Sequence, residues 1–195
     1  MLHRLLLVLS IGVITLLTAC GGAAQNTPAA TTASQMSGME HDMAQMSQSD
    51  LPYDALFIDS MIVHHQGAID MANQALKEAA KAEIKTLAEN IIKSQTAEID
   101  QMKAWRQAWY PDLAETGGMG MAMGTMEVSN DTTKPFDQRF IEAMIPHHEG
   151  AIGMAADAQQ KAEHKEIKLL ADTIIAAQAA EIAEMKQWLK DWYGQ

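Results

Sequence analysis

A gapless internal repeat is the strongest constraint on the fold of this 195-residue chain. Residues 54–110 align with residues 137–193 at a constant offset of 83, and 30 of the 57 aligned positions are identical. The first copy contains FIDSMIVHHQGAIDMA, and the second contains FIEAMIPHHEGAIGMA. A duplication of this kind predicts two copies of one supersecondary unit that bury their apolar faces against each other.

Each copy has the composition and the periodicity of an antiparallel helix pair. Both copies are rich in Ala, Ile, Leu, Met, Glu, Gln and Lys, which are good helix formers. Apolar positions recur at spacings of three and four residues, and this pattern slips around residues 78–82 and again around 161–165. Asp54 and Asp137 stand near the start of the two copies, where they are candidate first-turn acids or caps.

Two such pairs, each with one apolar stripe, predict an all-α four-helix bundle. We expect the bundle domain to span residues 51–195 and to contain the repeats 54–110 and 137–193. A linker rich in Met and Gly, residues 111–136, joins the two repeats.

The first twenty residues have the features of a bacterial lipoprotein signal. A positively charged start precedes an apolar run from Leu5 to Leu17, which is too short to remain as a spanning helix. The run ends in LTAC, which resembles a lipobox and contains the sole cysteine, Cys20. We expect residues 1–19 to be a signal peptide, Cys20 to be lipidated, and residues 20–50 to form a flexible Met-rich tether. This places the protein in the cell envelope, extracytoplasmic and lipid-anchored to a bacterial membrane.

Composition argues against several functions. A net charge of -11 opposes binding to nucleic acid, and a single cysteine excludes a disulfide within the chain. The sequence has no nucleophile–base set and no phosphate-binding loop, so we expect a binding protein and not an enzyme.

Methionine is unusually frequent, with fifteen Met against three Phe. Six Met lie in the expected helices and form three pairs at the repeat offset: Met61 and Met144, Met71 and Met154, Met102 and Met185. Core Met exchanges readily with Leu or Ile, so retention of every pair indicates that the thioether itself matters. A recent duplication would produce the same retention.

The other methionines of the mature chain lie in the tether and in the linker. They are Met36, Met39, Met43 and Met46, beside His41, and then Met119, Met121, Met123 and Met126. Thioether sulfur is a soft donor that selects Cu(I), and imidazole also suits copper. We therefore expect these segments to capture a soft metal such as Cu(I) or Ag(I). Compositional drift or an apolar patch for a partner is the alternative.

Histidines follow the same repeat. His64 and His65 in the first copy match His147 and His148 in the second, a turn after one Met and about two turns before another. Helical spacing places these side chains along one buried stripe, where each helix offers two imidazoles and two thioethers. A lone buried His is more often a satisfied core residue, but a duplicated Met-x-x-His-His-x-x-x-x-x-Met is less readily explained in that way.

A second polar set lies on the apolar stripe of the second helix in each copy. It comprises Gln95, Glu98 and Met102, matched by Gln178, Glu181 and Met185. Buried polar side chains need partners, and a histidine of the facing helix is the natural one. Such a contact would orient a ligand histidine or add a ligand. A purely structural Glu–His pair that keeps the bundle in register is the alternative.

The repeated Phe-x-x-x-Met-Ile-x-His-His-x-Gly-Ala-Ile-x-Met-Ala resembles the pattern of the bacterial DUF305 family, whose members include a periplasmic copper-binding protein. The later Gln-x-x-Glu-Ile-x-x-Met is similar to that family as well. The resemblance implies a ferritin-like four-helix fold, binding of Cu(I) or Ag(I), and a role in copper sequestration, transfer or tolerance. By residue match, the implied metal ligands are Met61, His64, His65, Met71, Met144, His147, His148 and Met154. The expected partners are a metal ion, the membrane, and a copper exporter or other copper-handling protein.

Two other functions compete with copper binding. A ferritin-like di-iron oxidase needs about four inward carboxylates and Glu-x-x-His pairs. Only Glu98 and Glu181 are repeated inward acids, and neither is followed by His three residues later. A structural or sensing bundle without metal is the third possibility, and it leaves the Met-rich tether and linker unexplained.

Overall fold

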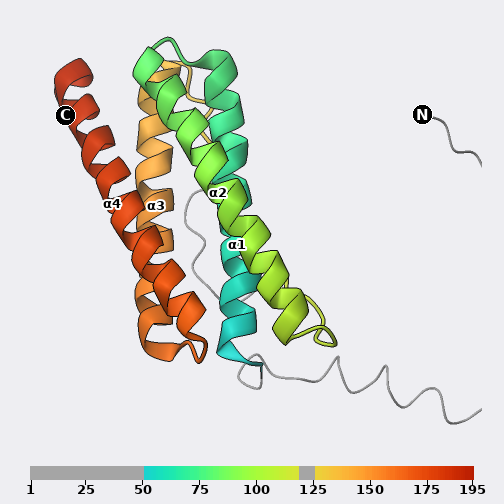
Figure 1. Ribbon diagram of the computed structural model, residues 1–195. Helices are drawn as coiled ribbons and strands as arrows, with labels where there is room; N and C mark the ends of the chain where they lie inside the picture. Colours follow the sequence, from blue (N-terminus) through green and yellow to red (C-terminus); the bar gives the residue numbers. More distant parts are fainter. Residues whose placement is uncertain (1–50, 119–125) are drawn as a thin grey trace, which may run out of the picture. The chain divides into compact units, whose positions relative to one another are not determined.

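The computed structural model describes residues 51–118 and 126–195, which belong to one compact unit. In these residues the chain forms four helices and no strands: α1 (Tyr53–Glu78), α2 (Ala82–Trp109), α3 (Phe136–Lys161) and α4 (Lys165–Tyr193). Figure 1 shows α1 and α2 as one antiparallel hairpin and α3 and α4 as the second. The predicted all-α four-helix bundle of two duplicated pairs is confirmed.

Several predictions from the sequence fall outside the described residues. These are the signal peptide, the lipidation of Cys20, the tether 20–50 and the three linker methionines Met119, Met121 and Met123. No helix of the described part combines the length and the apolarity needed to cross a membrane.

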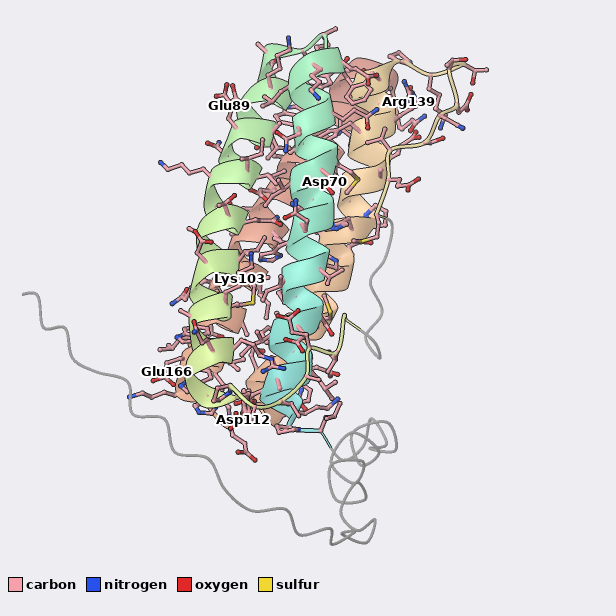
Figure 2. The ribbon with its side chains drawn as sticks, turned by 90° about the vertical axis from the view of Figure 1, so that its right-hand side faces the viewer. Asp70, Glu89, Lys103, Asp112, Arg139 and Glu166 are labelled. Atoms are coloured by element: carbon pink, nitrogen blue, oxygen red, sulfur yellow. The ribbon has the colours of Figure 1, made fainter. Side chains whose placement is uncertain are left out.

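Helix boundaries reproduce the repeat. The bounds of α3 follow those of α1 at the repeat offset, and α4 begins at the position that matches the start of α2. Only residues 79–81 and 162–164 separate the helices of each pair, where the apolar periodicity slips. Charged side chains such as Asp70, Glu89 and Lys103 are exposed and project from the outer faces (Figure 2).

Asp54 and Asp137 hold the two helix pairs together. Each lies in the first turn of its own helix, as predicted, and its carboxylate accepts hydrogen bonds from the short connection that precedes the second helix of the other repeat. The backbone N–H groups that donate to them lie just ahead of α4 and α2: Glu163 and His164 at 2.9 Å from Asp54, Ala80 at 3.2 Å and Lys81 at 2.9 Å from Asp137. Because each carboxylate belongs to one repeat and satisfies backbone donors of the other, these hydrogen bonds help fix how the pairs dock.

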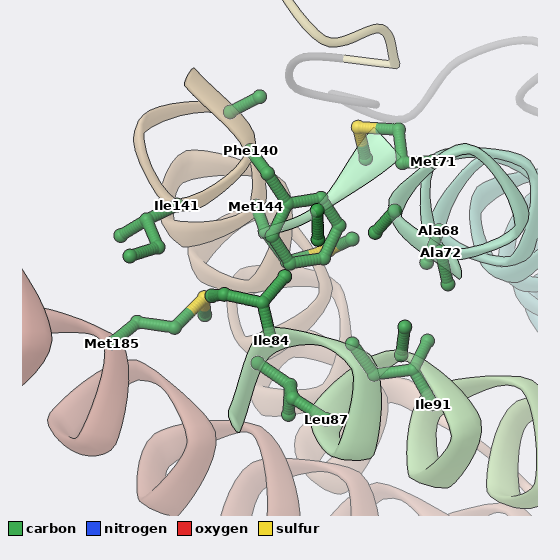
Figure 3. Close-up of a cluster of buried hydrophobic side chains, with 14 of the residues drawn as sticks. Ala68, Met71, Ala72, Ile84, Leu87, Ile91, Phe140, Ile141, Met144 and Met185 are labelled. Carbon is green, nitrogen blue, oxygen red and sulfur yellow. The ribbon is translucent and has the colours of Figure 1, made fainter. Parts of the chain in front are cut away.

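The core consists of two apolar clusters. In α1, buried apolar residues from Phe57 to Met61 belong to one cluster, called the second, and most of those from Ala68 onward belong to the other, called the first. Along α3 the order is reversed, because α1 and α3 are antiparallel where the two repeats meet. Figure 3 shows the first cluster, in which Phe140 and Ile84 pack with methionines from three helices. In α1 and in α3, the segment between the two clusters carries the histidine pair.

Candidate metal centre

Four histidines form a buried polar layer between the two apolar clusters. His64 and His65 come from α1, and His147 and His148 come from α3. Each of the four is 0 % exposed. The layer arises because the same His–His pair occurs at the same place in both repeats, and α1 crosses α3 there.

His64 and His147 face each other across the interface between the repeats. Their ring centroids lie 3.8 Å apart, and the ring planes are tilted by 44°. All four of their ring nitrogens lack a hydrogen-bond partner within the described residues. A buried polar group without a partner costs about 1–3 kcal/mol, so native cores rarely retain one. Four such atoms at one contact are therefore the feature of this core that calls for an explanation.

Burial keeps both of these imidazoles neutral at physiological pH. Desolvation lowers the pKa of His64 to about 3 and the pKa of His147 to about 2. The neighbouring histidines add to both pKa shifts, because a second positive charge in the layer would be repelled. A neutral imidazole carries the free lone pair that a metal ion needs, so both residues are ready to act as ligands at pH 7.

His65 and His148 each contact a carboxylate from the second helix of their own pair. His65 Nε2 lies 2.6 Å from Glu98 Oε2, and His148 Nε2 lies 2.7 Å from Glu181 Oε2. When Nε2–H donates to the carboxylate, the lone pair resides on Nδ1. Both Nδ1 atoms are buried and unpartnered in the described structure. These hydrogen bonds confirm the predicted contact between Glu and His. Histidines that ligate metals are commonly oriented by a carboxylate in this manner. The role of the contact in metal binding stays a prediction.

The rest of the second polar set also faces inward. Gln95 and Gln178 are each 3 % exposed, and the side-chain oxygen of each has no partner among the described residues. Met102 and Met185 are fully buried in the apolar clusters. These four side chains are therefore buried, as expected. Their function as additional ligands stays a prediction.

The two methionines of one helix do not lie together, as a metal site built from a single helix would require. Met61 and Met71 lie in different apolar clusters, on either side of the histidine layer, although both are on α1. The first cluster contains Met71 from α1, Met144 from α3 and Met185 from α4 (Figure 3). The second cluster contains Met61 from α1, Met154 from α3 and Met102 from α2. Each cluster therefore takes thioethers from both repeats.

Comparisons with known proteins agree with this architecture. The profile of DUF305, a domain of unknown function, matches residues 14–106 and 54–189. The chain belongs to the DUF305 family. Copper-bound CopM, in its Cu(I) form, is 43% identical, with 72% of this chain and 98% of that chain covered at a TM-score of 0.63. No curated protein matches the chain at a significant level.

Two further solved structures have the same fold. CopM co-crystallised with silver is 44% identical to this DUF305 protein, with 72% of this chain and 98% of that chain covered at a TM-score of 0.62. A DUF305 fragment from Deinococcus radiodurans is 28% identical, with 72% and 97% covered and a TM-score of 0.58. The bundle is therefore shared with relatives that span the repeat region.

The donors available in this DUF305 domain limit how it can hold a metal. Among residues 51–118 and 126–195, no three His, Cys, Asp or Glu side chains converge into a group that could bind an ion. A metal in the layer would therefore combine imidazole with another donor type, such as thioether. Of the residues expected to capture metal flexibly, Met126 is described, while Met36, Met39, His41, Met43, Met46, Met119, Met121 and Met123 are not.

Proposed function

We propose that this protein binds copper as Cu(I), with Ag(I) as an alternative ion, in the histidine layer and at the thioethers beside it. The observation that carries the proposal is the set of six buried ring nitrogens without a partner in the described part of the chain. Neutral imidazole and thioether together are a donor set that suits Cu(I). The ligands we propose are Met61, His64, His65, Met71, Met144, His147, His148 and Met154.

Similarity to CopM supports the same metal. CopM has been solved with Cu(I), Cu(II) and silver, and it is 43% to 44% identical to this chain in those forms. The motif with its His pair occurs once in each repeat, so both halves of the described bundle contribute histidines to the layer. We propose binding rather than catalysis, because the site offers metal donors and the sequence contains no set of reacting groups.

The proposed cellular role is copper sequestration, transfer or tolerance at the cell envelope. In this proposal, lipidated Cys20 anchors the mature chain on the extracytoplasmic side of a bacterial membrane. The tether and linker methionines collect the ion and pass it to the bundle, and a copper exporter or other copper-handling protein exchanges it. The sequence motif at Cys20 and the placement of methionine in both connecting segments support this role.

Competition for Cu(I) tests the proposed function. The wild-type chain, a His64/His65/His147/His148→Leu variant and a His164→Ala control are titrated anaerobically against a chromogenic Cu(I) chelator. We expect affinity to fall by more than about tenfold in the four-histidine variant and to stay unchanged in the control. Circular dichroism confirms that each variant remains helical.

Other outcomes identify the competing functions. Unchanged affinity in the four-histidine variant, with loss only on deletion of 36–46 and 117–126, would move the site to the connecting segments. No Cu(I) binding by the wild type would favour a structural or sensing bundle. Iron-dependent oxygen consumption would favour a di-iron oxidase, for which the described residues provide no carboxylate cluster.

A further inference from the structure

Met126, Gly67 and His147 meet at one point on the surface of α1. A methyl group added to Gly67 would overlap Cε of Met126 and would lie 3.1 Å from its Sδ. The same methyl group would lie 3.4 Å from Nε2 of His147. A thioether from the linker and an unpartnered imidazole nitrogen from α3 therefore approach the same small space.

Gly67 is the residue that leaves this space open. Glycine inside a helix is about 1 kcal/mol less stable than alanine, so its presence at a buried position needs a reason. Gly153 on α3 is different, because a methyl group there would meet nothing within 4 Å. At Gly67 the missing side chain makes room for the end of Met126.

A buried ion pair fastens the start of the linker to α1. Arg106 donates to Asp59 at 2.8 Å, and the N–H of Thr116 donates to the other carboxylate oxygen at 2.8 Å. Arg106 also donates to three carbonyl groups at the start of the linker: Tyr110 at 2.5 Å, Leu113 at 2.9 Å and Ala114 at 3.0 Å. This network orders the chain between the end of α2 and Thr116.

Both described ends of the linker lie on the same face of α1. A methyl group added to Gly118, at φ +78°, would lie 3.4 Å from Val63 and 3.6 Å from Ser60, as one added to Gly67 would meet Met126. These α1 positions are separated by three and four residues, so they follow one another along a single helix face. His64 lies between them in the sequence. The linker is thus held beside the histidine layer at both ends.

The second repeat has no equivalent of this network. The residues that match Asp59 and Arg106 are Glu142 and Leu189, and Leu189 cannot donate a hydrogen bond. Glu142 instead binds Lys134 at 2.7 Å. The linker therefore adds its thioether to a layer that is otherwise repeated in both halves.

We propose that Met126 Sδ is a ligand of the ion bound at His64 and His147, and that Gly67 is glycine so that this thioether can reach the ion. The proposal rests on the proposed function and adds a ligand from outside the duplicated helices. It supplies a donor of another type where the described residues bring no three His, Cys, Asp or Glu side chains together around one ion. A thioether in that place selects for soft ions such as Cu(I) and Ag(I).

Nuclear magnetic resonance of the mature chain, labelled with ¹³C at the methionine methyl groups, tests this ligand directly. Ag(I) is the probe, and Met126→Leu assigns the Met126 methyl signal. We expect the first equivalent of Ag(I) to shift this signal together with the ring signals of His64 and His147. Shifted histidine signals with an unmoved Met126 signal would overturn the inference and leave the proposed function intact. Silent histidine and methionine signals would overturn both.

A double-mutant cycle tests the role of Gly67. Gly67→Ala displaces the end of Met126, so we expect it to lower Ag(I) affinity about as much as Met126→Leu, by roughly tenfold. The two changes together should cost no more than either alone, because they remove the same contact. Gly153→Ala, at an exposed position of α3, is the control and should keep wild-type affinity. Additive losses, or wild-type affinity in Met126→Leu, would contradict the proposal.

Discussion

His64 and His147 are held neutral in the core, which sets how the metal-free fold responds to acid. An unfolded histidine has a pKa near 6.5, whereas burial lowers these two to about 3 and about 2. Between those values the unfolded chain binds protons that the folded chain does not bind. The contribution to stability is therefore complete above about pH 6.5 and is lost as the pH falls toward 3.

Urea unfolding of the metal-free protein between pH 7 and pH 4 checks this dependence. Each of the two histidines contributes a slope of at most about 1.4 kcal/mol per pH unit to the free energy of unfolding. A His64→Leu/His147→Leu variant should show a flatter profile and greater stability at pH 5, because it also removes buried polar atoms that lack partners. Parallel profiles for the two proteins would show that these histidines do not titrate in this manner.

Glu98 and Glu181 each contact one histidine of the layer and orient it. We expect Glu98→Gln to weaken Cu(I) binding by about 10- to 100-fold, because loss of the charge removes support for the Nδ1 lone pair of His65. Glu181→Gln should act alike through His148. Chelator competition measures both, and Glu89→Gln, at an exposed position of α2 (Figure 2), is the control. Reduced stability with unchanged affinity would indicate a structural Glu–His pair instead.

Helix ends explain how the two repeats are joined. Asp54 accepts hydrogen bonds ahead of α4 and Asp137 accepts them ahead of α2, so each carboxylate belongs to one repeat and serves the other. Asp54 also lies 2.6 Å from Nδ1 of His164, whereas Lys81 occupies the matching position in the other half. The two junctions are therefore related but unequal.

Removing these carboxylates tests the junction. Asp137→Ala should lower the free energy of unfolding by about 1–3 kcal/mol, because two backbone hydrogen bonds of about 0.5–1.5 kcal/mol each are lost. Asp54→Ala should lower it further, because the contact with His164 is lost as well. Chemical denaturation at pH 7 measures both, with exposed Asp112→Ala as the control. Equal effects at all three positions would contradict a role for Asp54 and Asp137 in docking the repeats.

Features that depend on spacing within one helix could be predicted from the sequence, whereas contacts between the repeats could not. The repeat and its helical period predicted α1 to α4 and the contacts of Glu98 and Glu181 with histidine, because those features depend on spacing within a helix. The grouping of Met61 with Met154, and the hydrogen bonds of Asp54 and Asp137 across the repeats, depend on how the two repeats meet. Met126 was assigned to a flexible segment because its surroundings have no period, and its place beside Gly67 results from tertiary contacts.

At the scale of the whole molecule, the histidine layer lies where the two repeats contact each other. His64 belongs to the first repeat and His147 to the second, so an ion bound to both would connect the helix pairs. Binding to the folded state alone shifts the unfolding equilibrium by mass action. Metal should therefore stabilise the bundle as one unit.

Thermal unfolding with Ag(I) measures this coupling. At a free-ion concentration of 100 times the dissociation constant, the expected stabilisation is about 2.7 kcal/mol. The wild-type protein should show a clear rise in its unfolding temperature, and the His64→Leu/His147→Leu variant should show little. An equal rise in both proteins would mean that the stabilising ion is bound elsewhere.

The most direct measurement is the anomalous diffraction of crystals loaded with one equivalent of Cu(I). The proposed function predicts that the strongest anomalous peak lies in the histidine layer, within coordination distance of ring nitrogens from both His64 and His147. Anomalous peaks confined to other parts of the molecule, with the rings of His64 and His147 unligated, would contradict the account.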